Sequence, residues 1–335
     1  QMCIRDSEDA VQQVSEYNIG GYILFGRDFD GKTKDEVVDD IHSYQNEADI
    51  PLLIGVDEEG GTVVRVSSNP NLRETPFLSP KDTYADGGWD AVKRDAEEKA
   101  DLLLSLGINV NLAPVCDMTS DEYGFMYDRS FSSDVDMENR YVRTVVETSK
   151  SKKLGTVLKH FPGYGNNSDT HTGIAYDDRD YSEFENTDFK PFYQGIESGA
   201  DCILVSHNIV NCMDSEYPAS LSQKVHDILR NEFKFDGVIM TDDLIMDAIT
   251  DFTGDEAAAV TAAKCGNDLL CCSSVDTQYP AVLEAVQNGE ISEAQVDASV
   301  KRILKWKQNL GIFNIDTYQK KVKSTEPTDT VGSEE

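Results

Sequence analysis

The chain has 335 residues, and 62 Asp and Glu against 30 Lys and Arg give it a formal net charge of −32 at pH 7. So acidic a surface repels nucleic acid and anionic lipid, and we expect no nucleic-acid partner. No apolar run approaches the roughly 20 residues that cross a bilayer, so we expect no transmembrane segment. Residues 1–7 resemble neither a natural start nor a secretion signal, which leaves cytoplasmic and exported or cell-surface locations both open.

The seven cysteines are odd in number, and several stand in apolar runs. This pattern favours buried free thiols over a disulfide framework. No C-x-x-C pair occurs, so a structural zinc site is not expected. We expect the chain to work without a cofactor.

Short apolar runs alternate with segments of helical periodicity along the chain, beginning with a strand-like run at 22–25 and a helix-like segment at 35–48. The remaining predicted strands are 52–56, 108–112, 156–158, 202–205, 238–240 and 268–272. The remaining predicted helices are 89–106, 137–153, 189–198, 223–233, 255–265, 275–289 and 292–310. Glycines that precede strands predict left-handed helix ends at Gly107, Gly155, Gly199, Gly237 and Gly266. Apolar strands between amphipathic helices indicate a parallel sheet covered on its faces.

This alternation predicts an α/β fold, a single (β/α)8 TIM-type barrel over residues 8–312, followed by a polar, disordered tail at 313–335. A barrel closes with eight strands and the sequence offers seven, so we expect the first strand to be missing from this chain. An open doubly wound sheet tolerates seven strands and is the alternative. No glycine-rich dinucleotide fingerprint follows any strand, which disfavours that alternative.

Ionisable residues follow five of the central predicted strands, at the end where a barrel places its chemistry. These residues are Asp57 and Arg65, then Asp117 and Arg129, then Lys159 and His160, then His207, and finally Asp242 and Asp243. A single polar strand end means little, but five that meet in one ring indicate a site.

Three residues carry a specific chemical prediction. Asp242 is a carboxylate at a strand end, suited to act as a nucleophile or base. Asp169 and His171 stand two apart in a loop rich in Gly, Asn and Ser. A carboxylate bonded to an imidazole fixes its tautomer and raises its basicity, which predicts a proton carrier useful near neutral pH.

Structural explanations compete with function at other positions. His160 could be a hydrogen-bonded core histidine, and Arg65 could form a weak surface ion pair with Glu58 or Glu59. Asp243 could cap a helix that starts near Leu244, as could Asp242. For Arg65, Asp243 and His207 taken singly, the structural explanation is at least as good as the functional one.

Five motifs in order resemble glycoside hydrolase family 3, in its bacterial β-N-acetylglucosaminidase branch. They are Asp57-Glu58-Glu59-Gly60-Gly61, Asp128-Arg129-Ser130-Phe131, Lys159-His160-Phe161-Pro162-Gly163, Asp169-Thr170-His171 and Thr241-Asp242-Asp243-Leu244. One such motif would be weak evidence, whereas five at plausible spacing are strong. The resemblance covers roughly residues 19–310.

The resemblance implies a retaining exo-β-N-acetylglucosaminidase that acts on terminal GlcNAc of peptidoglycan fragments or chitin-type oligosaccharides. It implies Asp242 as the nucleophile, His171 as the acid/base and Asp169 as its partner. The residues that match the family's hydroxyl-binding set are Asp57, Arg65, Arg129, Lys159 and His160. The family often has histidine where Tyr164 stands, which puts the loop shape in question.

Other functions stay open at this point. A phosphorylase would use the same covalent intermediate, and a neutral imidazole at His171 would repel phosphate less than a carboxylate. A metal-dependent barrel hydrolase would draw on Lys159, His160, His207 and Asp242. A silent glycan-binding barrel is disfavoured because a nucleophile and a proton carrier are both present. We expect a small carbohydrate as the partner and a monomer or weak oligomer.

Overall fold

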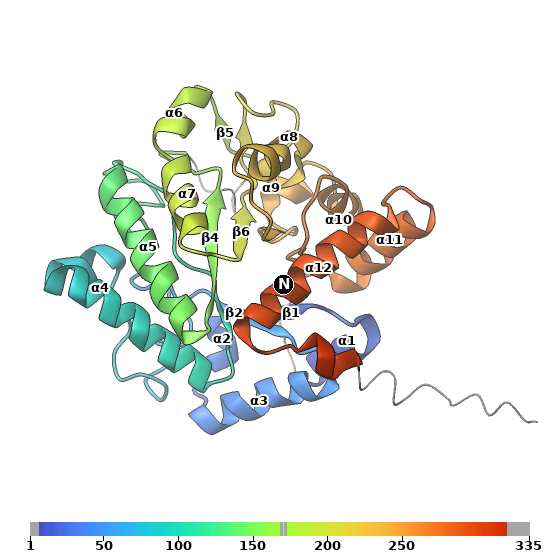
Figure 1. The fold of residues 1–335 in the computed structure, drawn as a ribbon, viewed down its shortest axis with the longest axis horizontal. Helices are drawn as coiled ribbons and strands as arrows, with labels where there is room; N and C mark the ends of the chain where they lie inside the picture. Colours follow the sequence, from blue (N-terminus) through green and yellow to red (C-terminus); the bar gives the residue numbers. More distant parts are fainter. Residues whose placement is uncertain (1–6, 168–169, 171–172, 320–335) are drawn as a thin grey trace, which may run out of the picture.

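The computed structural model describes residues 7–167, 170 and 173–319. In this part of the chain, helices surround a central curved sheet whose strands all run parallel (Figure 1). The main sheet has six strands in the order β1-β2-β3-β4-β6-β8. Their bounds are β1 Gly21–Leu24, β2 Leu53–Val56, β3 Val110–Asn111, β4 Gly155–Phe161, β6 Cys202–Val205 and β8 Val238–Thr241. The α/β class and the parallel strand order are therefore confirmed.

The described residues form an open half-barrel, so the closed eight-stranded barrel is not observed. The seventh predicted strand, 268–272, follows the edge of β8 with a single bridge between Met240 and Leu269. Side chains replace part of the ladder, since Asp268 Oδ2 accepts a hydrogen bond from Ile239 N at 2.9 Å and Thr241 Oγ1 accepts one from Cys271 N at 3.0 Å. Among the described residues, no strand lies between this segment and β1.

Two very short strands, β5 Tyr176–Asp177 and β7 Ile209–Val210, pair in parallel outside the main sheet. Neither strand belongs to an apolar run long enough to predict it. They tie the end of the loop after β4 to the loop after β6, because Ile209 N donates to Ala175 O at 2.8 Å and Asn211 N donates to Asp177 O at 2.9 Å.

The predicted helices are present, with changed ends. The helix bounds are α1 Ser7–Tyr17, α2 Gly26–Phe29, α3 Lys34–Glu47, α4 Pro80–Ser105, α5 Val135–Lys152, α6 Tyr181–Asn186, α7 Phe189–Glu197, α8 Gln223–Asp227, α9 Asp247–Thr250, α10 Asp255–Lys264, α11 Val275–Gln287 and α12 Glu293–Leu310. α4 begins at Pro80 rather than 89 because Ser79 caps it, and a kink at Gly87 and Gly88 interrupts the helical pattern. The predicted helix 223–233 divides into α8 and a π-helical turn, Ile228–Glu232.

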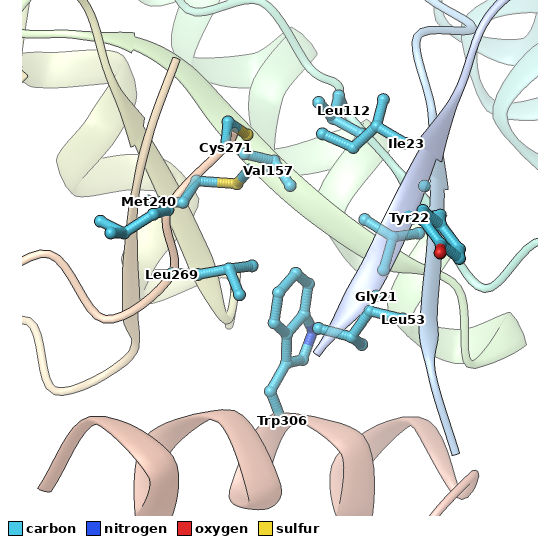
Figure 2. Close-up of a pocket in the computed structure, with 13 residues that line it drawn as sticks. Gly21, Tyr22, Ile23, Leu53, Leu112, Val157, Met240, Leu269, Cys271 and Trp306 are labelled. Carbon is cyan, nitrogen blue, oxygen red and sulfur yellow. The ribbon is translucent and has the colours of Figure 1, made fainter. Parts of the chain in front are cut away.

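Side chains of the strands alternate between the sheet's two faces. Val238 and Met240 point into the interior of the half-barrel, whereas Ile239 between them packs outward with the helices. Trp306 of α12 enters this interior beside Leu269 and Gly21 (Figure 2). The sheet thus has an apolar floor, which leaves polar chemistry to its carboxyl end.

Two of the five predicted glycine caps are wrong. Gly107, Gly199 and Gly266 have the positive φ that a left-handed cap requires, but Lys153 and Lys234 take that conformation ahead of Gly155 and Gly237. Gly155 is needed for another reason: a Cβ there would lie 3.1 Å from the Trp306 ring. The sequence pattern predicted the position of β4 correctly, but the predicted role of Gly155 as a helix cap was wrong.

The structure can be compared with the sequence on its cysteines, on membrane crossing and on the start of the polar tail. The six cysteines within the described ranges are free thiols, and four of them are buried. Within those ranges no helix combines the length and apolarity needed to cross a bilayer. The tail predicted to be disordered from residue 313 is ordered in its first residues, since Phe313 is buried and its ring lies 5.8 Å from that of Tyr318. Residues 320–335, most of the predicted polar tail, lie outside the described residues.

Candidate active site

A cavity of about 510 Å³ opens at the carboxyl end of the sheet. Six residues predicted from the sequence line it together: Asp57, Arg65, Arg129, Lys159, His160 and Asp242. The remaining two, Asp169 and His171, lie outside the described residues. Apolar side chains complete the wall, among them Phe25, Val63 and Met246.

The parallel topology explains why residues so distant in sequence meet. Asp57 directly follows β2, Asp242 directly follows β8, and Lys159 and His160 stand at the end of β4. The carboxyl ends of neighbouring parallel strands share one edge, so these side chains converge. Arg65 comes from the loop after β2, and Arg129 from the loop that joins β3 to α5.

Lys159 is buried between two carboxylates. Its Nζ lies 2.6 Å from Asp57 Oδ1 and 2.6 Å from Glu59 Oε1. Burial alone would lower the pKa of Lys159, but Asp57 and Glu59 outweigh burial and raise it. Lys159 is therefore a fixed cation that cannot serve as a base, and it holds Asp57 at the cavity wall as a hydrogen-bond acceptor.

Glu59 receives a second cation, Arg129, in a bidentate arrangement. Arg129 Nε and Nη2 lie 2.9 and 2.8 Å from the two oxygens of Glu59. Burial would raise the pKa of Glu59, yet Lys159 and Arg129 together hold it well below its usual range. Glu59 is thus a permanent anion that aligns two donors along one wall.

His160 is oriented by Asp117, a buried carboxylate. Asp117 Oδ2 lies 2.7 Å from His160 Nδ1 and accepts a hydrogen bond from His160 N at 2.9 Å. On the other side of the ring, Nε2 lies 3.2 Å from Arg129 Nη2. His160 lines the cavity as well, so it is more than a core histidine.

The backbone of Arg65 is held by a hydrogen bond, and its side chain lines the cavity. The buried carboxylate of Glu58 accepts hydrogen bonds from Arg65 N at 2.9 Å and Val66 N at 2.7 Å. The surface ion pair with Glu58 or Glu59 is therefore not formed. Arg65 Nε is buried without a hydrogen-bond partner among the described residues, and its guanidinium lies 6.0 Å from the centre of the Phe25 ring. A buried donor in this state favours an acceptor supplied by a ligand.

The two strand-end aspartates after β8 differ in their surroundings. Asp243 lies 2.6 Å from Ser273 Oγ and accepts a weak hydrogen bond from Ile245 N at 3.3 Å, so it orders the turn. Burial raises the pKa of Asp243. Asp242 N donates to Val205 O at 3.1 Å, and Asp242 Oδ1 accepts a hydrogen bond from Asp243 N at 2.9 Å. These bonds fix the Asp242 backbone at the cavity.

Among residues 7–167, 170 and 173–319, no three His, Cys, Asp or Glu side chains converge so as to hold a metal ion. His207 is fully buried, with Nδ1 2.7 Å from Ser220 Oγ and Nε2 2.9 Å from Asp243 O. His207 therefore has a structural role in this part of the molecule.

The family model described as "Glycosyl hydrolase family 3 N terminal domain" matches residues 1–306. The chain belongs to glycosyl hydrolase family 3. It is therefore a glycoside hydrolase.

The curated relatives carry the name beta-hexosaminidase. A beta-hexosaminidase of Hydrogenovibrio crunogenus is 31% identical over 286 residues, covering 83% of this chain and 79% of that protein. Beta-hexosaminidase LpqI of Mycobacterium tuberculosis is 31% identical over 317 residues, covering 90% and 78%. Among solved structures, a family 3 β-N-acetylglucosaminidase from Paenibacillus sp. str. FPU-7 superposes with a TM-score of 0.85 at 28% identity. That match covers 97% of this chain and 61% of the Paenibacillus chain, so this chain spans less than two thirds of it.

Two residues that organise this cavity, Glu59 and Asp117, do not stand out in the sequence. The local pattern offers Glu59 only as a surface partner of Arg65, and it places Asp117 at a strand end without a role. The Glu59 contact with Arg129 spans 70 residues, and the Asp117 contact with His160 spans 43. A run of three acidic residues followed by two glycines, directly after a buried strand, was the one available signal for Glu59.

Proposed function

We propose that the chain is a retaining exo-β-N-acetylglucosaminidase that releases terminal β-linked GlcNAc. The observation that carries the proposal is one cavity in which Asp242 shares the wall with Asp57, Arg129, Lys159 and His160. The names of the curated relatives, β-hexosaminidases, and of the Paenibacillus structure support this substrate class. Fixed donors and acceptors of this kind match the hydroxyl groups of a sugar ring.

The proposed reaction has two steps with one covalent intermediate. In the first, an Asp242 oxygen attacks the anomeric carbon, the glycosidic C–O bond breaks, and the leaving oxygen takes a proton from His171. In the second, His171 removes a proton from water, whose oxygen attacks the anomeric carbon and releases Asp242. Asp169 would keep the imidazole in its working tautomer. Two displacements return the original anomeric configuration.

The test combines stereochemistry with trapping. Proton NMR of a GlcNAc β-glycoside during early turnover should show the β-anomer first. A 5-fluoro-GlcNAc fluoride should leave a mass adduct on the peptide that contains Asp242, and Asp242→Asn should abolish both turnover and adduct. An α-anomer as the first product, or an adduct on another residue, would refute the retaining assignment.

A phosphorylase is the second candidate, because phosphate could replace water in the second step. The buried Arg65 Nε, which has no hydrogen-bond partner among the described residues, is a donor suited to an anion at this site. Added phosphate should then divert product from GlcNAc to GlcNAc-1-phosphate. If the product stays unchanged at high phosphate, the phosphorylase is ruled out and the hydrolase is the single remaining candidate.

Parallel assays with chitobiose and a peptidoglycan disaccharide would separate the two natural substrate classes.

We also propose that the open sheet represents seven of the eight positions of a (β/α)8 barrel, with segment 268–272 as one of them. The strictly parallel order and the inward alternation of β8 support this assignment. Pairs of cysteines, one in β1 and one at or near Leu269, test this assignment. A disulfide between them would show that β1 and segment 268–272 are direct neighbours with no room for an eighth strand, and would contradict it.

A further inference from the structure

His207, at the carboxyl end of β6, contacts the turn that follows β8. In the sheet, Val205 of β6 pairs with Thr241 of β8. Because these strands are parallel, the residues two positions further on, His207 and Asp243, reach the same level. His207 is fully buried, and its Nε2 lies 2.9 Å from Asp243 O. The imidazole therefore joins the ends of two neighbouring strands.

The partners of His207 define which ring nitrogen carries the proton. Asp243 O is a carbonyl oxygen and can only accept, so Nε2 is protonated and donates to it. In the neutral ring, Nδ1 then accepts a hydrogen bond from Ser220 Oγ, 2.7 Å away. Ser220 is itself fixed, since its N donates to Ser206 O at 2.9 Å and its O accepts from Asn267 Nδ2 at 2.8 Å. The ring is thus held in one orientation, with an N–H directed at Asp243.

Asp243 in turn contacts the proposed nucleophile, Asp242. Asp243 N donates to Asp242 Oδ1 at 2.9 Å. On the other side of the turn, Ser273 Oγ donates to Asp243 Oδ2 at 2.6 Å. The carbonyl and the carboxylate of Asp243 are therefore both bound, and its N–H restrains the rotation of the Asp242 carboxylate.

We propose that His207 is a positioning residue for the nucleophilic step, because it fixes Asp243 and thereby the Asp242 carboxylate that attacks the anomeric carbon. The proposal rests on the proposed function, which assigns the nucleophile to Asp242. His207 is not among the described residues that line the cavity, so the wall that binds the sugar does not depend on it directly. Attack is more sensitive to geometry than binding is, since a misplacement of about 1 Å can cost on the order of 100-fold in rate.

The experiment measures attack and binding separately. The rate constant for inactivation by a 5-fluoro-GlcNAc fluoride reports attack, because that reaction forms the bond to Asp242. The inhibition constant of GlcNAc, as a competitive inhibitor, reports binding to the cavity wall. A purely structural histidine would affect both constants, whereas a positioning residue affects the first.

Two substitutions of His207 differ in whether a donor reaches Asp243 O. His207→Asn is too short to replace Nε2, whereas His207→Gln places an amide N–H close to the position of Nε2. We expect inactivation to slow on the order of 10- to 100-fold in His207→Asn and less than about 5-fold in His207→Gln. The inhibition constant should stay within about 2-fold of wild type in both. Equal inactivation rates for the two variants, or a parallel loss of GlcNAc binding, would overturn the proposal.

Ser273 provides a second arm, which decides the question if His207→Asn does not fold. Ser273 is only partly buried, and Ser273→Ala removes its hydrogen bond to Asp243 Oδ2. We expect inactivation to slow by roughly 3- to 10-fold with an unchanged inhibition constant. Unchanged inactivation in this variant would show that the orientation of Asp243 does not limit attack, and would then overturn the proposal.

Two controls separate the possible failures. His226→Asn makes the same change at another buried histidine, whose Nδ1 lies 2.7 Å from Ser222 O, and should leave both constants close to those of wild type. Equal slowing in His226→Asn and His207→Asn would mark a general loss of packing and overturn the proposal. Asp242→Asn must abolish inactivation; if it does not, the nucleophile assignment fails and the positioning proposal fails with it. If Asp242→Asn abolishes inactivation and His207→Asn does not slow it, the positioning role alone is wrong.

Discussion

Asp117 Oδ2 lies 2.7 Å from His160 Nδ1, and the same oxygen accepts a hydrogen bond from His160 N. Backbone and side chain of one residue are thereby bound to a single buried oxygen. The ring can then turn only with loss of a charge-assisted bond, so Nε2 stays toward Arg129 and the cavity. His160 lines the cavity, and its geometry depends on Asp117, a carboxylate that does not line it.

We expect Asp117→Asn to lower kcat/KM by on the order of 10- to 100-fold, because a hydrogen bond to a charged group contributes about 1.5–3 kcal/mol. An amide also presents a donor to His160 Nδ1 and so favours the wrong tautomer. Steady-state kinetics on an aryl GlcNAc glycoside measures the effect. Asp214→Asn is the matched control, since Asp214 is buried and bonded to Ser222 Oγ at 2.7 Å outside the cavity. Equal activity of both variants would contradict the role of Asp117.

Glu59→Gln should destabilise the fold at pH 7 by roughly 3–5 kcal/mol, because it leaves Lys159 and Arg129 buried around a neutral group. The folded pKa of Glu59 is held below its usual value, so its stabilisation is present above about pH 4.3 and is lost as the pH falls. Urea unfolding of wild type and variant should therefore differ most at neutral pH and converge in acid. Glu98→Gln is the control, since Glu98 is largely exposed in its pair with Arg73 and should cost at most about 1 kcal/mol.

Features set by local sequence could be predicted, whereas features set by contacts between distant residues could not. Apolar runs predicted the strands, and the residue after each run predicted Asp57 and Asp242, because both follow from local pattern and parallel topology. Glu59 and Asp117 were missed because their partners are far away in sequence and burial of an acidic run cannot be read locally. The strands β5 and β7 have two residues each and leave no periodic signal.

Trp306→Ala should lower the free energy of unfolding by roughly 3–5 kcal/mol, since the ring fills the floor of the half-barrel against Gly155. Trp306→Phe should cost less, because Trp306 Nε1 is buried without a hydrogen-bond partner among the described residues and no bond is lost. Urea unfolding checks both values. A larger loss for phenylalanine than for alanine would contradict this packing role.

Lys307→Met should stabilise the protein at neutral pH. Lys307 of α12 is only 3% exposed, it lies beside Ile303 and Leu304, and burial lowers its pKa to about 8. The folded pKa is below the unfolded value, so the unfolded state binds more protons between about pH 8 and 10.4 and wild-type stability rises with pH there. The gap corresponds to roughly 3 kcal/mol. The advantage of methionine should thus be full at pH 7 and shrink toward pH 10, which urea unfolding at both values would show.

At one wall of the cavity, Lys159 and Arg129 form ion pairs with Asp57 and Glu59, so the charges of these four groups cancel. A neutral sugar that binds there replaces the water at these groups and leaves the local charge unchanged. Its binding therefore neither takes up nor releases salt ions. Despite the net charge of −32, substrate affinity should then be almost insensitive to ionic strength. The attraction of an anionic acceptor such as phosphate to the site would instead weaken as ionic strength rises. The dependence of the rate on ionic strength therefore distinguishes phosphate from water as the acceptor.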